Sequence, residues 1–357
     1  MSKGPTKLNC IGERAVTYDL PPEHRWAVVL AGGDGKRVLG LSRMIAGDSR
    51  PKQFCRFFGN KSLLAHTQER IAPLFRPDRT LFVLSRRHES YYREEFKNAE
   101  DRCLLAQPAN RGTAAAVMLS LQTVLRRDED AVVAFFPSDH HYLDPTAFRA
   151  TVDRALTLAE EYPHSVMLIG ADASYPEVEY GWIEPGRALV DSPINPLHRV
   201  SRFWEKPALE KAIRLQTRGC LWNTFVMIGL ATAFFELILT TQPQLLRRFE
   251  PIRCNHDLDR VYDSVDPVDF SQGVLSNVPQ RLMVLGDGMS GWSDLGSPRR
   301  VLNTMAGYEF EWWNETLRTG DCFPWRTGAA QLPGTGRTRP TMHVSKARRF
   351  AALCRFV

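Results

Sequence analysis

Long apolar runs are missing from this sequence. None of its 357 residues belongs to a run approaching the roughly 18 apolar residues that a membrane-spanning helix needs. The first 25 residues are polar and contain no apolar stretch of the kind that marks a secretory signal. We therefore expect a cytoplasmic protein without a membrane partner, in which residues 1–25 form a loosely ordered leader.

Paired cysteines are missing as well. The seven cysteines are odd in number, scattered along the chain, and contain no Cys-x-x-Cys pair. This pattern argues against a disulfide framework and against a zinc site, and it fits reduced thiols. His140 and His141 have no histidine or cysteine at metal-site spacing, so we do not expect them to bind zinc.

An excess of charge is missing from the body of the chain. The formal net charge is +6, but residues 312–357 hold eight basic and two acidic residues, which leaves 38 of each sign elsewhere. A basic tail on a neutral body gives little support to a nucleic-acid partner, which would require salt-dependent binding by that tail. Helix and strand signals fade past Arg300, and we expect residues 305–357 to be a largely disordered basic tail.

What is present is a regular alternation of strand and helix patterns. Strands are predicted at 26–30, 80–84, 104–105, 131–136 and 166–169, with helices at 62–75, 89–98, 114–126 and 145–161. Farther along, strands with aromatic residues are predicted at 180–186, 200–207, 221–226 and 281–285, with helices at 208–215 and 231–239. This alternation predicts an α/β fold: a Rossmann-like mixed, mostly parallel sheet flanked by helices. Ligands of such folds bind beyond the carboxyl ends of the strands.

A glycine-rich stretch follows the first strand and reads Leu30-Ala31-Gly32-Gly33-Asp34-Gly35-Lys36-Arg37. Glycines let the backbone bring its N–H groups close to an anion, and the two basic residues add charge beside it. We interpret the stretch as a cradle for nucleotide phosphates. Its spacing matches neither the dinucleotide fingerprint nor the P-loop, so an ordinary turn is the alternative.

Polar residues stand at the ends of other strands. Asp139 and Asp294 are candidate ligands for a hard cation such as Mg²⁺, with a helix cap and an Asx turn as the respective alternatives. Lys206 ends an aromatic strand, where its charge could reach a phosphate. Glu184 and Asn223 lie among aromatic residues in a pattern that suits a sugar, or simply an edge strand.

Seven motifs occur in one order along the chain. They are Gly32-Gly33-x-Gly-x-Arg37, Pro51-Lys52-Gln53, Pro137-Ser138-Asp139-His140, Tyr180-Gly181-Trp182-Ile183-Glu184, Phe203-Trp204-Glu205-Lys206-Pro207, Trp222-Asn223 and Trp292-Ser293-Asp294-Leu295-Gly296. In this order they resemble the sugar-1-phosphate nucleotidyltransferases, and most of all the bacterial mannose-1-phosphate guanylyltransferase branch. The resemblance implies a catalytic domain at 26–304, with a nucleotide half at 26–171 and a sugar half at 172–304.

The resemblance also implies substrates and roles: GTP, mannose 1-phosphate, Mg²⁺ as cofactor, and a homodimer as a candidate assembly. The catalytic residues implied are Arg37, Lys52, Asp139 and Lys206. Nucleotide binding is implied for Leu30, Ala31, Gly32, Gly33, Gly35, Lys36, Gln107, Asn110, Gly112 and Thr113. Sugar-phosphate binding is implied for Gly181, Glu184, Glu205, Lys206 and Asn223, and metal binding for Asp139 and Asp294.

The chain departs from the family pattern in two places. The loop between Arg37 and Lys52 is longer than the compact family form, and Gln107 stands where guanylyl enzymes usually carry glutamate. Glutamine occurs there in thymidylyl and uridylyl relatives, so transfer of those nucleotides is an alternative. A non-catalytic nucleotide-sugar sensor is another. A glycosyltransferase is a third, although Ser138-Asp139-His140 is not the Asp-x-Asp motif common in such enzymes.

Overall fold

The computed structural model describes residues 23–97, 100–190, 195–250, 252 and 254–307. Nearly all of the predicted leader at 1–25, and all but residues 305–307 of the predicted tail, therefore lie outside the described residues. In the part that is described, no helix is long and apolar enough to cross a membrane.

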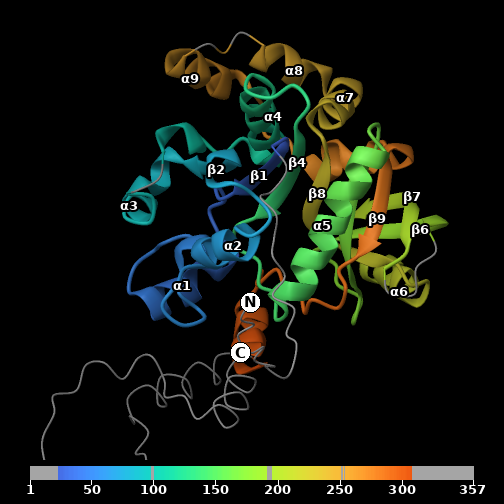
Figure 1. Cartoon of the computed structure of the whole chain (residues 1–357). Helices are drawn as coiled ribbons and strands as arrows, with labels where there is room; N and C mark the ends of the chain where they lie inside the picture. Colours follow the sequence, from blue (N-terminus) through green and yellow to red (C-terminus); the bar gives the residue numbers. More distant parts are fainter. Residues whose placement is uncertain (1–22, 98–99, 191–194, 251, 253, 308–357) are drawn as a thin grey trace, which may run out of the picture.

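The described strands form one mixed sheet in the order β3-β2-β1-β4-β8-β5-β9-β7-β6 (Figure 1). They are β1 Arg25–Leu30, β2 Thr80–Ser85, β3 Leu104–Gln107, β4 Val132–Pro137, β5 Val166–Asp172, β6 Gly181–Val190, β7 Leu197–Glu205, β8 Leu221–Leu230 and β9 Leu282–Gly286. The first four strands pair in parallel, as do β5 and β9. β8 runs antiparallel to β4, β5 and β6, and β7 runs antiparallel to β6 and β9. The predicted mixed sheet is confirmed.

Helices connect these strands and cover the sheet. They are α1 Leu39–Ala46, α2 Leu63–Ile71, α3 Glu89–Tyr92, α4 Gly112–Leu125, α5 Pro145–Glu161, α6 Leu209–Thr217, α7 Ala231–Thr241, α8 Pro243–Phe249, α9 Asn255–Ser264 and α10 Phe270–Gly273. Figure 1 shows α4, α7, α8 and α9 grouped together, and α5 lies against β5, β8 and β9. The helix expected at 89–98 is wrong in length, because α3 ends after a single turn.

Alternating side chains of the strands build a core on each face of the sheet. In β4, the ring of Phe135 lies 5.0 Å from that of Phe234 in α7. Its neighbour Phe136 points to the other face and lies 6.1 Å from Phe148 in α5. This period of two, on strands buried on both sides, explains why the continuous apolar run of β4 forms a strand.

Two polar side chains cap helices, and one of them excludes the alternative that Asp139 is a helix cap. The Ser62 hydroxyl accepts a hydrogen bond from the Ala65 amide at 3.0 Å and caps α2, as predicted. The Asp144 carboxylate accepts from the first amides of α5. Asp139 therefore does not cap α5, and its carboxylate has other partners.

One helix at 298–307 corrects the prediction that regular structure fades past Arg300. Val301 in this helix is fully buried and belongs to a small core with Leu41, Phe58 and Leu295. The predicted domain end at 304 falls inside this helix. Its apolar positions are too few for the sequence pattern to stand out, and its stability comes from these distant contacts.

We predict that Gly112→Ala lowers the free energy of unfolding by more than about 2 kcal/mol. Gly112 has φ +78°, and an added Cβ would lie 2.3 Å from the Val268 carbonyl oxygen. Gly219 has a similar φ of +71° with nothing within 4 Å of such a Cβ. Gly219→Ala should therefore cost only the backbone strain of about 1–2 kcal/mol. Equal losses in urea unfolding would contradict the proposed close approach.

Candidate active site

A cavity of about 680 Å³ opens where the carboxyl ends of β1 and β4 meet the start of β6 and the end of β7. This volume lies in the range of sites for small organic ligands. Twelve of the residues selected from the sequence line it: Leu30, Gly32, Gly33, Gln107, Asn110, Gly112, Thr113, Asp139, Gly181, Glu205, Asn223 and Asp294. The structure thus brings together residues from both predicted halves.

The glycine-rich loop is fixed by a side chain from a second motif. The Gln53 amide nitrogen donates to the carbonyl oxygens of Ala31 and Gly33 at 2.9 and 2.8 Å. Gly32 and Gly33 line the cavity, whereas Ala31 and Gly35 do not. Gln53 therefore positions the loop, a role that sequence reasoning missed although Gln53 stands in the quoted Pro51-Lys52-Gln53 motif.

Residues 107–113, which the family resemblance places where the nucleotide base is read, are held in place by a later part of the chain. The Thr113 hydroxyl oxygen accepts a hydrogen bond from the Phe270 amide at 2.7 Å. The Ala114 amide donates to the Val268 carbonyl at 3.0 Å. These contacts fix the start of α4, and with it Gly112 and Thr113, against the wall of the cavity.

Three of the predicted sugar-phosphate residues, Gly181, Glu205 and Asn223, also line the cavity. Gly181 leaves room that a Cβ would fill, because such an atom would lie 2.9 Å from a Glu205 carboxylate oxygen. The Asn223 side-chain oxygen accepts from the Phe225 amide at 3.1 Å, and Phe225 has φ +60°. Burial raises the pKa of the Glu205 carboxyl, although the neighbouring Lys206 opposes this shift. The wall thus offers carboxylate and amide groups suited to hydroxyls.

Lys52 contacts both Asp139 and Asp294, which lie far apart in the sequence. It is 5% exposed, its ammonium lies 3.0 Å from an Asp139 carboxylate oxygen, and it donates a short hydrogen bond to the Asp294 backbone carbonyl. Lys52 itself does not line the cavity. It forms an ion pair with Asp139, which lies two residues after β4 and faces the cavity.

Asp139 is ionised, whereas its neighbour His140 is neutral. Burial favours the neutral form of the Asp139 carboxyl, but the charge of Lys52 outweighs it and the pKa of Asp139 is lowered. Burial lowers the pKa of His140 to about 4, so this imidazole is neutral at pH 7. The Trp292 indole N–H donates to His140 Nδ1 at 3.1 Å, which places the imidazole proton on Nε2.

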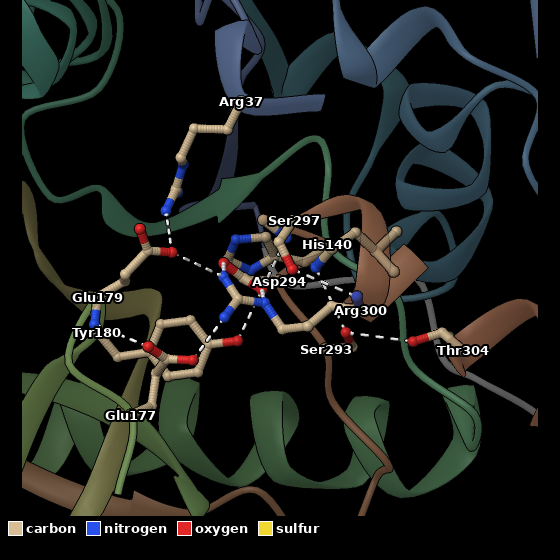
Figure 2. Close-up of polar contacts among 12 residues, drawn as sticks. Arg37, His140, Glu177, Glu179, Tyr180, Ser293, Asp294, Ser297, Arg300 and Thr304 are labelled. Carbon is tan, nitrogen blue, oxygen red and sulfur yellow. Dashed lines mark hydrogen bonds and ion pairs between the residues drawn. The ribbon is translucent and has the colours of Figure 1, made fainter. Parts of the chain in front are cut away.

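Asp294 is the centre of a network that the sequence did not reveal (Figure 2). Its carboxylate accepts from the Tyr180 hydroxyl at 2.6 Å and from the Gly296 amide at 2.9 Å, so the Asx-turn alternative holds. Arg300 Nε lies 2.9 Å from the same carboxylate, and Arg300 Nη1 donates to Glu177 at 2.5 Å. No family motif marked Arg300, which reaches the site from the helix at 298–307.

Seven predicted residues do not line the cavity: Ala31, Gly35, Lys36, Arg37, Lys52, Glu184 and Lys206. Arg37 pairs with Glu179 at 2.6 Å, and Lys206 with Glu205 at 3.0 Å. Lys36 lies 3.9 Å from Asp34. Arg37 and Lys206 are more than half exposed and pair with acids that line the cavity, so both stand at its rim.

Glu184 is not among the residues that line the cavity. Its carboxylate accepts hydrogen bonds from Arg218 and from the Trp204 indole N–H. Its side chain is 11% exposed. A direct sugar contact by Glu184 stays a prediction, as do the roles expected for the other site residues.

Two carboxylates could take part in binding a hard cation. Asp139 fits, since it lines the cavity and pairs with Lys52 through Oδ2, while its Oδ1 lies 3.8 Å from His140 Nε2. The Asp294 carboxylate lines the same cavity but is already held by Tyr180, Gly296 and Arg300. Among the described residues, no three His, Cys, Asp or Glu side chains gather as a metal site. Mg²⁺ is usually bound by one or two carboxylates together with substrate phosphates.

We predict that Asp139→Asn lowers the free energy of unfolding by about 1–3 kcal/mol, because it leaves the Lys52 ammonium buried without a carboxylate. The loss stays below that of a fully buried pair since the Asp139 side chain is 32% exposed. In Lys52→Met/Asp139→Asn the loss should be smaller than the sum of the single losses.

Urea unfolding followed by circular dichroism measures these differences. Glu69→Gln serves as the matched control, because it breaks the exposed pair of Glu69 with Lys61 and should cost less than about 1 kcal/mol. Strictly additive losses for Lys52 and Asp139 would show that the pair is not coupled.

Comparisons with known proteins all point to one protein family. The model of the nucleotidyl transferase family matches residues 26–310. The alginate biosynthesis protein AlgA of Pseudomonas fluorescens is 28% identical over 285 residues, covering 75% of this chain and 56% of AlgA. The mannose-1-phosphate guanylyltransferase of Klebsiella pneumoniae is 29% identical over 224 residues, covering 61% of this chain and 45% of that protein. The chain spans about half the length of these curated relatives.

Solved structures agree with this result. A crystal structure described as mannose-1-phosphate geranyltransferase from Thermus thermophilus is 30% identical, covers 79% of both chains and has a TM-score of 0.68. A structure described as mannose-6-phosphate isomerase from Helicobacter pylori, 24% identical over 76% of this chain and 99% of its own, has a TM-score of 0.60 and shows the shared fold alone. The resemblance drawn from the ordered motifs is confirmed: this chain belongs to the nucleotidyl transferase family.

Proposed function

We propose that the protein transfers a nucleotidyl group from GTP to mannose 1-phosphate, forming GDP-mannose and pyrophosphate. The observation that carries the proposal is the single cavity in which the glycine-rich loop and Gln107 face Gly181, Glu205 and Asn223. A nucleotide and a sugar phosphate can meet there. Support also comes from relatives described as mannose-1-phosphate guanylyltransferases.

The chemistry needs positioning more than a protein nucleophile. A phosphate oxygen of the sugar 1-phosphate attacks the α-phosphorus, the new P–O bond forms, and the bond to the β-phosphate oxygen breaks to release pyrophosphate. Arg37 and Lys206 at the rim, and Lys52 beneath the cavity, reduce the repulsion between the two anionic substrates. The exposed rim cations can exchange their present carboxylate partners for phosphate oxygens.

Members of this family generally use a divalent metal ion. In our proposal the ion is Mg²⁺, Asp139 is its main protein ligand, and Asp294 is the second. Once bound, it would neutralise phosphate charge and act as a Lewis acid at the reacting phosphate. The chain's own contribution is to hold the Asp139 carboxylate ionised at the cavity wall through Lys52.

One observation favours a uridine or thymidine nucleotide in place of GTP. Gln107 in the cavity wall carries an amide where a carboxylate would suit the N–H groups of guanine. Thymidylyl or uridylyl transfer to a hexose 1-phosphate is therefore the alternative reaction on the same site. A nucleotide-sugar sensor would bind the same ligands without turnover.

Pyrophosphate release tests these proposals directly. In the assay, GTP, ATP, UTP and dTTP are each combined with mannose 1-phosphate or glucose 1-phosphate in the presence of Mg²⁺. We expect the highest rate for GTP with mannose 1-phosphate. Asp139→Asn should lower kcat at least about 100-fold, whereas Asp153→Asn, which alters an exposed acid on α5, should not. Absence of release with every pair would favour the sensor, and full activity of Asp139→Asn would remove the metal role.

A further inference from the structure

One buried contact joins the cavity wall to α9. The hydroxyl of Tyr262 lies 2.9 Å from the side-chain oxygen of Gln107, although the two residues are 155 positions apart. Tyr262 is fully buried in α9, and burial raises the pKa of its phenol, so the hydroxyl keeps its proton. It therefore donates to Gln107.

The surroundings fix the orientation of the Gln107 amide. The amide nitrogen faces the Leu84 carbonyl oxygen at 3.4 Å, and a carbonyl oxygen can only accept. With nitrogen on that side, the amide oxygen faces Tyr262 and is occupied by its hydroxyl. The amide is thus oriented by two independent partners.

The nitrogen end of the amide reaches the cavity wall. A Cβ built on Gly32 would lie 2.7 Å from Gln107 Nε2, and both residues line the cavity. Leu84 takes one of the two N–H groups, and the second is available on the cavity side, while the amide oxygen is turned toward Tyr262. At this point the wall presents a hydrogen-bond donor.

Tyr262 itself is anchored on both sides. Its backbone carbonyl accepts a hydrogen bond from Arg111 Nε at 2.5 Å, and its ring lies 5.8 Å from that of Phe249 in α8. Arg111 belongs to the same segment as Gln107. Residues 107–113 and α9 are therefore joined by two hydrogen bonds, and the tyrosine ring packs against α8.

We propose that Tyr262 is a positioning residue that turns the Gln107 amide so that its N–H, and not its oxygen, faces the base, and that the site thereby selects nucleobases with a keto oxygen over those with an amino group. Guanine, uracil and thymine present such an oxygen, whereas adenine and cytosine present an N–H₂ donor at the corresponding position. A donor facing a donor leaves both unpaired, which favours the keto bases by roughly 10-fold to 100-fold. This inference rests on the proposed placement of the base beside Gln107.

Tyr262→Phe tests the proposal, because it removes the hydroxyl and keeps the ring. The measured quantity is the ratio of kcat/KM for the best keto nucleotide among GTP, UTP and dTTP to kcat/KM for ATP, with mannose 1-phosphate as the second substrate. We expect the ratio to be high in the unaltered protein and to fall about 10-fold in Tyr262→Phe, with the KM for mannose 1-phosphate unchanged. Tyr92→Phe, at a buried tyrosine in the opposite core, should leave the ratio as it was.

A second pair of variants probes the same amide without touching Tyr262. Gly32→Ala places a methyl group against Gln107 Nε2 and should lower the ratio, while Gly40→Ala, in α1 and outside the cavity lining, meets nothing within 4 Å and should not. Equal use of ATP and the keto nucleotides by the unaltered protein, or an unchanged ratio in Tyr262→Phe and Gly32→Ala, would overturn the inference.

The outcome is separable from that of the proposed reaction. If no nucleotide supports pyrophosphate release, calorimetric binding of GDP, UDP and ADP replaces the kinetic ratio. Tighter binding of GDP or UDP than of ADP, lost in Tyr262→Phe, would support the inference while the transferase proposal fails. Equal binding of all three would contradict the inference as well.

Discussion

The ammonium group of Lys52 holds this site together. It is buried between the Asp139 carboxylate at the end of β4 and the Asp294 carbonyl in the segment after β9, two points 155 residues apart in the sequence. A buried ammonium is costly unless it is paired, so the fold that buries Lys52 must also bring these two partners to it. The adjacent pairing of His141 with Ser293 joins the same two segments.

The charges around the cavity follow the same logic. The cations assigned to phosphates are matched by nearby carboxylates, Arg37 by Glu179 and Lys206 by Glu205. At the exposed rim such pairs are weak, since water solvates both partners. In the pair of Lys52 and Asp139 the ammonium is buried, so water screens this pair less. The site thus combines the ion pair of Lys52 and Asp139 with exposed cations at the rim that are available to an anionic ligand.

The sequence predicted the central strands well because they are buried apolar runs bounded by turn residues, as in β4. It predicted the meeting of the glycine-rich loop with Asp139, since the carboxyl ends of neighbouring parallel strands share one edge of a sheet. It missed Arg300 and Tyr262, because their roles depend on contacts with residues far away in the chain. No local pattern distinguishes Tyr262 from any buried tyrosine on an amphipathic helix.

The central claim is that one cavity receives both the nucleotide and the sugar phosphate. A crystal structure of the protein with GDP-mannose tests it most directly. The account predicts the guanine beside Gln107 and Gly32, the mannose beside Gly181 and Asn223, and the phosphates between them near Asp139. GDP-mannose bound outside this cavity, or with its base and sugar ends exchanged, would contradict the account.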